Sequence, residues 1–223
     1  MAGNLPTSHS QRVTDFLAKV QATHRGRLLF IVDATGSRER AWDMASKLQA
    51  DMFNAAAGIV TLDVQLVYFR GMVGFDGECK ASRWTNDARE LTHFMAPVTC
   101  RTGHTQIARA LGHARKEHQA QPISAIVYIG DMCEEQAQAL YDATAALSGV
   151  PCFMFQEGDD PPAAEIFKEM ARLSRGAYSK FSPGSARELA ELLRAVAAFV
   201  VGGLTALADQ RTDSARKLLG QMK

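Results

Sequence analysis

Short apolar runs alternate with longer segments of helical period along most of this chain, and this alternation restricts the fold more than any other feature. Apolar strands are expected at residues 28–32, 64–69, 123–129, 150–155 and 177–181. Helical periodicity fills the intervals, first at residues 38–57 and again after Gly103. Parallel strands need such crossover helices. We therefore expect an α/β fold with a Rossmann-like open, mostly parallel sheet and helices on both faces.

Weaker patterns complete this organisation. Further helices are expected at residues 134–147, 162–173 and 185–201, and a short antiparallel edge strand at residues 78–84 follows a glycine-containing turn. We divide the chain into a partly helical lead-in at 1–25, an α/β domain at 26–203 and a basic amphipathic segment at 204–223. In that last segment Leu218, Leu219 and Met222 share one side.

The composition fits one domain with a substantial core. The 223 residues are 47% apolar and 22% charged, and 25 Lys plus Arg against 24 Asp plus Glu give a formal charge of +1. Because this balance provides no basic field, we expect no nucleic-acid partner. The four cysteines are widely spaced and form no C-x-x-C pair, so we expect small buried side chains.

Two features bear on location. The first residues lack the charged and then apolar blocks of a secretory signal, which favours a cytoplasmic chain. The most lipid-like run, residues 196–208, is shorter than the roughly 20 apolar residues that span a bilayer. We therefore expect a core helix there and no membrane partner. The sequence gives no oligomeric state.

Three polar turns are expected at one edge of the sheet. Asp33, Thr35 and Ser37 follow the first strand, Thr105 lies in the turn that enters a helix, and Asp131 follows the strand at 123–129. The carboxyl ends of parallel strands meet at the same edge, where ligands gather. Carboxylate and hydroxyl oxygens suit a hard divalent cation. The sequence therefore predicts an Mg²⁺ or Mn²⁺ site made of these five residues.

The spacing of these motifs resembles the von Willebrand factor A (VWA) domain. The metal-ion-dependent adhesion site of that family reads D-x-S/T-x-S, then a threonine in a G-x-T turn, then an aspartate after the next strand. Asp33, Thr35 and Ser37 match the first motif, Thr105 the second and Asp131 the third. The resemblance covers about residues 26–203. Met132 replaces the usual glycine after the aspartate, and His104 stands where a second glycine is common.

The resemblance implies a protein-binding module rather than an enzyme. In that family an Mg²⁺ or Mn²⁺ ion keeps one coordination position open, and a Glu or Asp from a protein partner completes it. The implied metal ligands are Asp33, Thr35, Ser37, Thr105 and Asp131. The implied rim of the partner-binding surface is Arg38, His104 and Met132. No catalytic residue is expected under this interpretation.

Two alternatives stay open from the residues themselves. Asp33-Ala34-Thr35-Gly36-Ser37 also resembles the Asp-Lys-Thr-Gly-Thr motif of haloacid-dehalogenase-like phosphotransferases, in which Asp33 would be the nucleophile. The acidic run from Asp131 to Glu135 approximates the metal motif of that family. In the other alternative, the Asp, Thr and Ser side chains only cap helices and turns.

Overall fold

The chain folds around a six-stranded, mostly parallel sheet. The computed structural model describes residues 25–39, 62–183 and 185–222. The strands are β1 (Gly26–Asp33), β2 (Leu62–Arg70), β3 (Glu78–Ala81), β4 (Ala125–Gly130), β5 (Cys152–Glu157) and β6 (Ala177–Phe181). Their order is β3-β2-β1-β4-β5-β6, and the edge pair of β2 and β3 is antiparallel while the other pairs are parallel. The predicted α/β sheet with one short antiparallel edge strand is confirmed.

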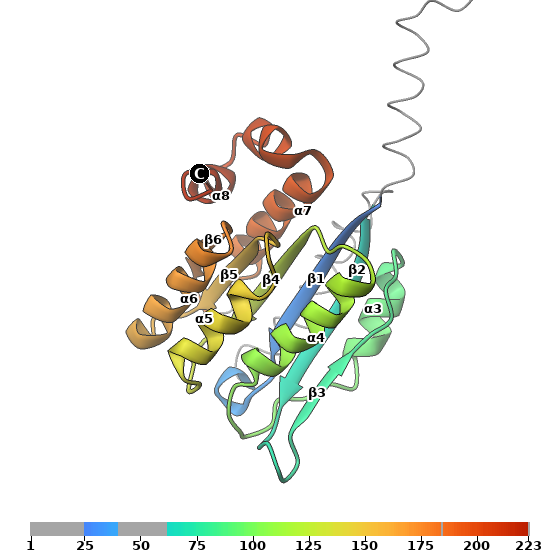
Figure 1. The fold of residues 1–223 in the computed structure, drawn as a ribbon, viewed down its shortest axis with the longest axis vertical. Coiled ribbons are helices and arrows are strands. Elements are labelled where there is room, and N and C mark those ends of the chain that lie inside the picture. The colour runs from blue at the N-terminus through green and yellow to red at the C-terminus, as the bar shows by residue number, and fades with distance from the viewer. Residues whose placement is uncertain (1–24, 40–61, 184, 223) are drawn as a thin grey trace, which may run out of the picture.

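Helices cover both faces of this sheet. Successive side chains of a strand point to opposite faces, so Phe30 and Val32 enter one core while Leu29 and Ile31 enter the other. The first core is closed by α3 (Ala88–Met95), α7 (Ala186–Asp209) and α8 (Asp213–Leu219). The second is closed by α4 (Ile107–Ala120), α5 (Ala137–Ala145) and α6 (Pro161–Leu173), which lie side by side in Figure 1.

Helix α7 consists of two helical segments joined at a kink, and the first segment matches the helix predicted at residues 185–201. Helical dihedral angles break at Gly202 and Gly203, where Gly203 has φ +65°, and the helix then continues to Asp209. By length and composition alone, residues 187–209 are long and apolar enough to cross a membrane, because they extend beyond the apolar run at 196–208. A core helix can meet the same requirement, and Leu192, Val196 and Leu207 are buried in the first core.

The C-terminal segment packs on the sheet. Leu218 and Met222, on the predicted apolar side, are buried in the first core. Gln221 extends the contact to β6, because its amide oxygen accepts from the Tyr178 N–H and its amide nitrogen donates to the Tyr178 carbonyl, both at 2.9 Å. Residues 204–222 are therefore integrated with the α/β domain.

Other differences from the expected elements are local. Helix α3 was not predicted, although Asp87 caps it by accepting from the Arg89 N–H, and Leu91 and Met95 are buried at helical spacing. The predicted helix at 38–57 lies outside the described residues from position 40 onward, and so does the lead-in up to residue 24.

Candidate metal centre

The first loop of the candidate site begins where β1 ends. The Asp33 side chain is buried, and its Oδ1 accepts a 2.7 Å hydrogen bond from the Thr35 N–H. The hydroxyls of Thr35 and Ser37 lie 3.3 Å apart, Thr35 buried and Ser37 exposed. A 3₁₀ turn, Gly36–Arg38, follows at once. The loop therefore carries three oxygen-bearing side chains, of which Asp33 and Thr35 are buried and Ser37 is exposed.

The second loop, residues 101–106, lies against the first. The Arg101 N–H donates to the Ala34 carbonyl at 3.0 Å, which forms a parallel bridge between residues 35 and 101. A Cβ at Gly36 would lie 3.3 Å from the Cα of Thr102, so the two backbones nearly touch. This contact brings the second loop, which carries the buried Thr105, against the first loop.

The third loop follows β4 and is tied to the second by its acidic residues. Val32 pairs with Ile129, so β1 and β4 end at the same height and Asp131 leaves the sheet beside Asp33. The Thr105 hydroxyl accepts from the Glu134 N–H at 3.3 Å, and the Thr105 N–H donates to Glu134 Oε2 at 3.1 Å. These reciprocal bonds hold the second and third loops together.

Glu135 strengthens the same junction at the start of α4. Its carboxylate accepts from the Ile107 and Ala108 N–H groups, two of the helix donors that have no partner within the helix. Sequence reasoning noted Glu134 and Glu135 only as part of an alternative phosphotransferase motif. Their position directly after Asp131, at a predicted strand end, was the available signal for this role.

Arg38 is buried beneath the candidate site, which corrects its predicted place on the rim. Only 1% of its side chain is exposed. Its Nη1 donates to the Asp33 carbonyl at 2.7 Å, and its Nε and Nη2 donate to Glu157 Oε2 at 3.0 and 2.9 Å. In this position Arg38 cannot contact a partner at the surface, and it holds the first loop to the end of β5.

Glu157 was missed by the sequence analysis. It ends β5 directly after the apolar run that was predicted as a strand, and Gln156 before it is also buried. Two polar residues at the carboxyl end of a buried strand were the signal that could have identified this position. The other two predicted rim residues, His104 and Met132, are exposed.

The electrostatics of the site are dominated by the burial of Asp33. Desolvation raises the pKa of Asp33 to about 7, against the opposing effects of Arg38 and of the hydrogen bonds from Thr35. The nearby negative charge of Asp131 raises the pKa further. Burial also raises the pKa of Tyr128 well above its ordinary value, so its hydroxyl stays protonated. The desolvation of Asp33 therefore outweighs the opposing positive charge of Arg38.

Three buried side-chain oxygens in the described chain have no hydrogen-bond partner: Asp33 Oδ2, Asp131 Oδ1 and the Tyr128 hydroxyl. Leaving such a group unpaired costs about 1–3 kcal/mol, and more for a charged group, so native proteins rarely do so. All three belong to β1, β4 or the loop after β4. Unpaired carboxylate oxygens of this kind are suited to receive a cation or water.

The donor set fits a hard divalent ion only if hydroxyls take part. Among the described residues, no group of three or more His, Cys, Asp or Glu side chains lies close enough together to hold a metal. The candidate site offers two carboxylates, Asp33 and Asp131, with the hydroxyls of Thr35, Ser37 and Thr105 from the adjoining loops. Such all-oxygen sets suit Mg²⁺ or Mn²⁺.

Comparisons with known proteins identify the fold and no family. No protein-family model matches the sequence, and no curated protein matches it. One similar solved structure is an aerotolerance-related membrane protein from Bacteroides fragilis, with a TM-score of 0.57 and 16% identity over 75% of this chain and 96% of that one. This likeness spans almost the whole of that chain.

Two other similar structures are bacterial pilus proteins. The pilus adhesin SpaC from Lactobacillus rhamnosus GG has a TM-score of 0.63 at 10% identity, and 80% of this chain covers 30% of the adhesin. The PilB minor pilin from Streptococcus sanguinis has a TM-score of 0.59 at 11% identity, with 80% and 62% of the two chains covered. This chain therefore spans about a third of the adhesin. At these identities the likeness shows the α/β fold alone.

Proposed function

We propose that this chain is a VWA-type, metal-dependent protein-binding module. In this proposal an Mg²⁺ or Mn²⁺ ion is held by Asp33, Thr35, Ser37, Thr105 and Asp131, and a Glu or Asp carboxylate of a protein partner completes its coordination. When bound, the ion supplies a positive charge that attracts and orients an outside anion. His104 and Met132 are exposed beside these loops and form the rim.

The observation that carries the proposal is the pair of unpartnered carboxylate oxygens, Asp33 Oδ2 and Asp131 Oδ1. The fold buries both at the ends of neighbouring strands, and the cation beneath them, Arg38, already donates to Glu157 and to the Asp33 backbone. A bound divalent ion would give both oxygens a partner. If Asp33 only capped the turn, its Oδ1 would be explained, because Oδ1 accepts a hydrogen bond from the Thr35 N–H. Capping does not explain why Oδ2 is buried without a partner.

Recognition fits the site better than phosphotransfer does. A nucleophilic aspartate must reach the phosphorus of its substrate, whereas Asp33 has no exposed surface. The SpaC and PilB structures, which share the fold, are named as an adhesin and a pilin. This analogy of fold supports a protein-binding role without assigning a partner. A cytoplasmic location stays a prediction.

Isothermal titration of chelator-stripped protein with Mg²⁺ and then Mn²⁺ tests the metal site. We expect saturable binding of about one ion, as for sites of this donor type, and loss of that binding in Asp33→Ala. Asp160→Asn is the matched control, because Asp160 also accepts a backbone N–H, that of Ala163 at 2.8 Å, but caps α6 rather than joining the site. Absence of binding to the wild type would refute the metal site.

The phosphotransfer alternative predicts an enzymatic activity that the binding proposal does not. It requires Mg²⁺-dependent hydrolysis of a phosphate ester, or a base-labile phosphoryl group on Asp33. Hydrolysis of p-nitrophenyl phosphate that is lost in Asp33→Ala would favour this alternative. We expect no such activity.

A further inference from the structure

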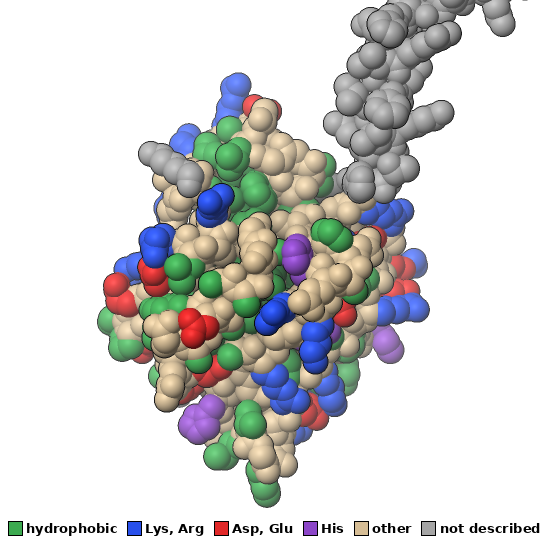
Figure 2. Space-filling view, in the orientation of Figure 1, with side chains coloured by type: hydrophobic (Ala, Val, Ile, Leu, Met, Phe, Trp, Pro, Cys, Tyr) green, Lys and Arg blue, Asp and Glu red, His purple; other side chains and the backbone are tan. Residues whose placement is uncertain are grey.

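The turn between β2 and β3 exposes large apolar side chains at the edge that carries the candidate site. Met72, Val73 and Phe75, which we call the hairpin tip, are 46%, 69% and 91% exposed. The hairpin lies at the lower end of the molecule in Figure 1, and Figure 2 shows hydrophobic side chains gathered there. Met132 adds a fourth exposed apolar side chain directly after Asp131. Large exposed apolar side chains gathered in one region mark interaction sites.

The hairpin tip is held in one conformation by its own backbone. The N–H groups of Phe75 and Asp76 both donate to the Met72 carbonyl at 3.1 Å, and Asp76 Oδ1 accepts from the Met72 N–H at 2.9 Å. Gly71 and Gly74 adopt positive φ angles of +75° and +87°, which the tight turn requires. The apolar side chains are therefore presented to solvent by an ordered turn.

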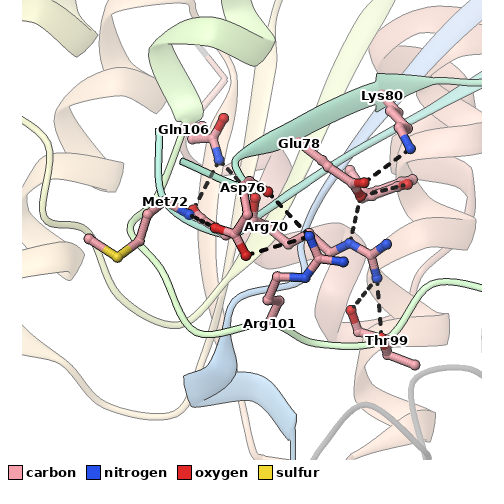
Figure 3. A network of polar contacts seen from close by, with 10 residues as sticks. Arg70, Met72, Asp76, Glu78, Lys80, Thr99, Arg101 and Gln106 are labelled. Carbon is pink, nitrogen blue, oxygen red and sulfur yellow. Dashed lines mark hydrogen bonds and ion pairs between the residues drawn. The ribbon is translucent and has the colours of Figure 1, made fainter. Parts of the chain in front are cut away.

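A polar network fixes the base of the hairpin (Figure 3). Arg70 Nε donates to Glu78 Oε2 at 2.7 Å across the two strands, and Arg70 Nη1 donates to the Thr99 carbonyl at 2.7 Å. On the other side, Arg101 Nη1 donates to the Asp76 carbonyl at 3.2 Å. These bonds join the hairpin to residues 99–101, the start of the loop that carries Thr105.

The same loop touches the hairpin again on either side of Thr105. The buried amide of Gln106 donates to the carbonyls of Arg70 and Gly71 at 3.0 and 3.3 Å. A Cβ at Gly103 would lie 2.2 Å from the Gly71 carbonyl, so only glycine permits this approach. The hairpin tip and the Thr105 turn therefore belong to one rigid unit at the carboxyl edge of the sheet.

We infer that the partner-binding surface has two parts, the metal site and the hairpin tip. The hairpin tip selects among partner segments by the residues that flank their Glu or Asp. The inference rests on the proposed metal-dependent function. A partner segment that places its Glu or Asp on the ion would lay neighbouring residues over the hairpin tip, and large apolar residues there would bury Phe75 and Val73. Aromatic side chains held rigidly at an interface supply much of its binding energy. The expected partner is thus a protein segment in which a Glu or Asp is flanked by large apolar residues.

The charges around the hairpin favour a protein over a lipid surface. Peripheral membrane contacts combine an apolar tip with free Lys or Arg side chains that attract anionic headgroups. Here Arg70 and Lys80 pair with Glu78 at 2.7 and 3.1 Å, and Arg101 pairs with Asp76 at 3.6 Å. Each of these three cations near the tip therefore has a carboxylate neighbour, and Arg70 and Lys80 share Glu78.

The test uses two fluorescent peptides that share a central Glu, one flanked by Leu and Phe and the other by Ser and Gly. With saturating Mn²⁺, we expect wild-type protein to bind the apolar-flanked peptide at least about tenfold more tightly, which corresponds to burying about one large side chain. In Phe75→Ser this preference should fall below about threefold, while Mn²⁺ binding and binding of the Ser/Gly peptide stay unchanged.

Leu173→Ser is the matched control, because Leu173 is also exposed, at 37%, but lies at the end of α6. The preference of Leu173→Ser for the apolar-flanked peptide should equal that of the wild type. Because Phe75 contributes almost no burial, Phe75→Ser should fold normally, as circular dichroism can verify.

The different failures are distinguishable. If Mn²⁺ does not bind, or if replacing the central Glu by Gln changes nothing, the proposed metal-dependent function is wrong. If Mn²⁺ and both peptides bind but the flanking residues make no difference, the function stands and the role of the hairpin tip is overturned. A wild-type dimer that Phe75→Ser converts to a monomer, or wild-type binding to phosphatidylserine vesicles that Phe75→Ser abolishes, also overturns the inference, because another occupant then covers the tip.

Discussion

Replacing Asp33 by Asn should stabilise the metal-free protein, because the native carboxylate is buried at a cost. Burial raises the pKa of Asp33 from 3.8 in the unfolded chain to about 7 in the folded protein. The folded state therefore binds the proton more tightly, and this contribution to stability is present below pH 3.8 and lost as the pH rises through 7. A difference of roughly three pKa units corresponds to about 4 kcal/mol.

At pH 8 the wild-type protein without metal carries this whole destabilisation, whereas the amide introduced by Asp33→Asn does not titrate. The amide oxygen can keep the hydrogen bond that Asp33 Oδ1 accepts from the Thr35 N–H. Its NH₂ group would replace an oxygen that has no partner, at a cost of about 1–3 kcal/mol if it stays unpaired. We therefore expect Asp33→Asn to be more stable than the metal-free wild type by about 1–3 kcal/mol.

Metal should offset most or all of this difference. Mg²⁺ at about one hundred times its dissociation constant stabilises the wild type by about 2.7 kcal/mol, and Asp33→Asn should gain nothing. Urea denaturation at pH 8, with chelator or with Mg²⁺, measures both differences, and Asp160→Asn should match the wild type in both conditions. If metal-free Asp33→Asn is instead less stable by about 0.5–2 kcal/mol, Asp33 acts as a simple cap and the reasoning from its buried charge is refuted.

Three further predictions follow from the same contacts. Because protons compete with the ion for Asp33, Mg²⁺ affinity should fall by about tenfold per pH unit below pH 7, and titrations that show a flat profile would contradict the assigned pKa. Arg38→Met removes the buried Arg38–Glu157 ion pair and should cost about 3–5 kcal/mol in urea denaturation, whereas Arg38→Met combined with Glu157→Met should recover most of the loss. Thr105→Val should weaken Mn²⁺ binding by about tenfold or more while Thr105→Ser retains it; equal titration curves would remove Thr105 from the ligand set.

Local pattern was sufficient to predict five of the six strands because each of these is a short apolar run bounded by polar residues or glycine. The edge strand β3 is not apolar and was predicted from the glycine-containing turn before it. Residues 177–181, the weakest of these runs, form β6 with the predicted bounds. Helix ends were harder to predict. Ser185 caps α7 as its spacing to Glu188 suggested, and helical dihedral angles break at Gly202 and Gly203, directly after the predicted end. The pattern did not predict the second helical segment to Asp209, which packs Leu207 in the core.

The candidate ligands were identifiable for a different reason. In a parallel sheet every strand delivers its following loop to the same edge, so Asp33, Thr105 and Asp131 could be grouped before their contacts were known. The environment of each ligand could not be read in this way. The burial of Arg38 depends on Glu157, which is 119 positions away in sequence, and the motif that places Arg38 after Ser37 carries no information about that partner.

The sequence by itself determined the α/β class, the polar turns at the strand ends and the oxygen chemistry of the proposed site, because these depend on residue type and short spacing. Tertiary structure alone decided which carboxylate oxygens are buried without partners, that Arg38 lies beneath the loops, and that the hairpin tip stands beside Thr105. Each of these depends on contacts between segments distant along the chain, such as Gly71 against Gly103. Periodicity shows which face of an element is buried, and only the packed fold shows what that face meets.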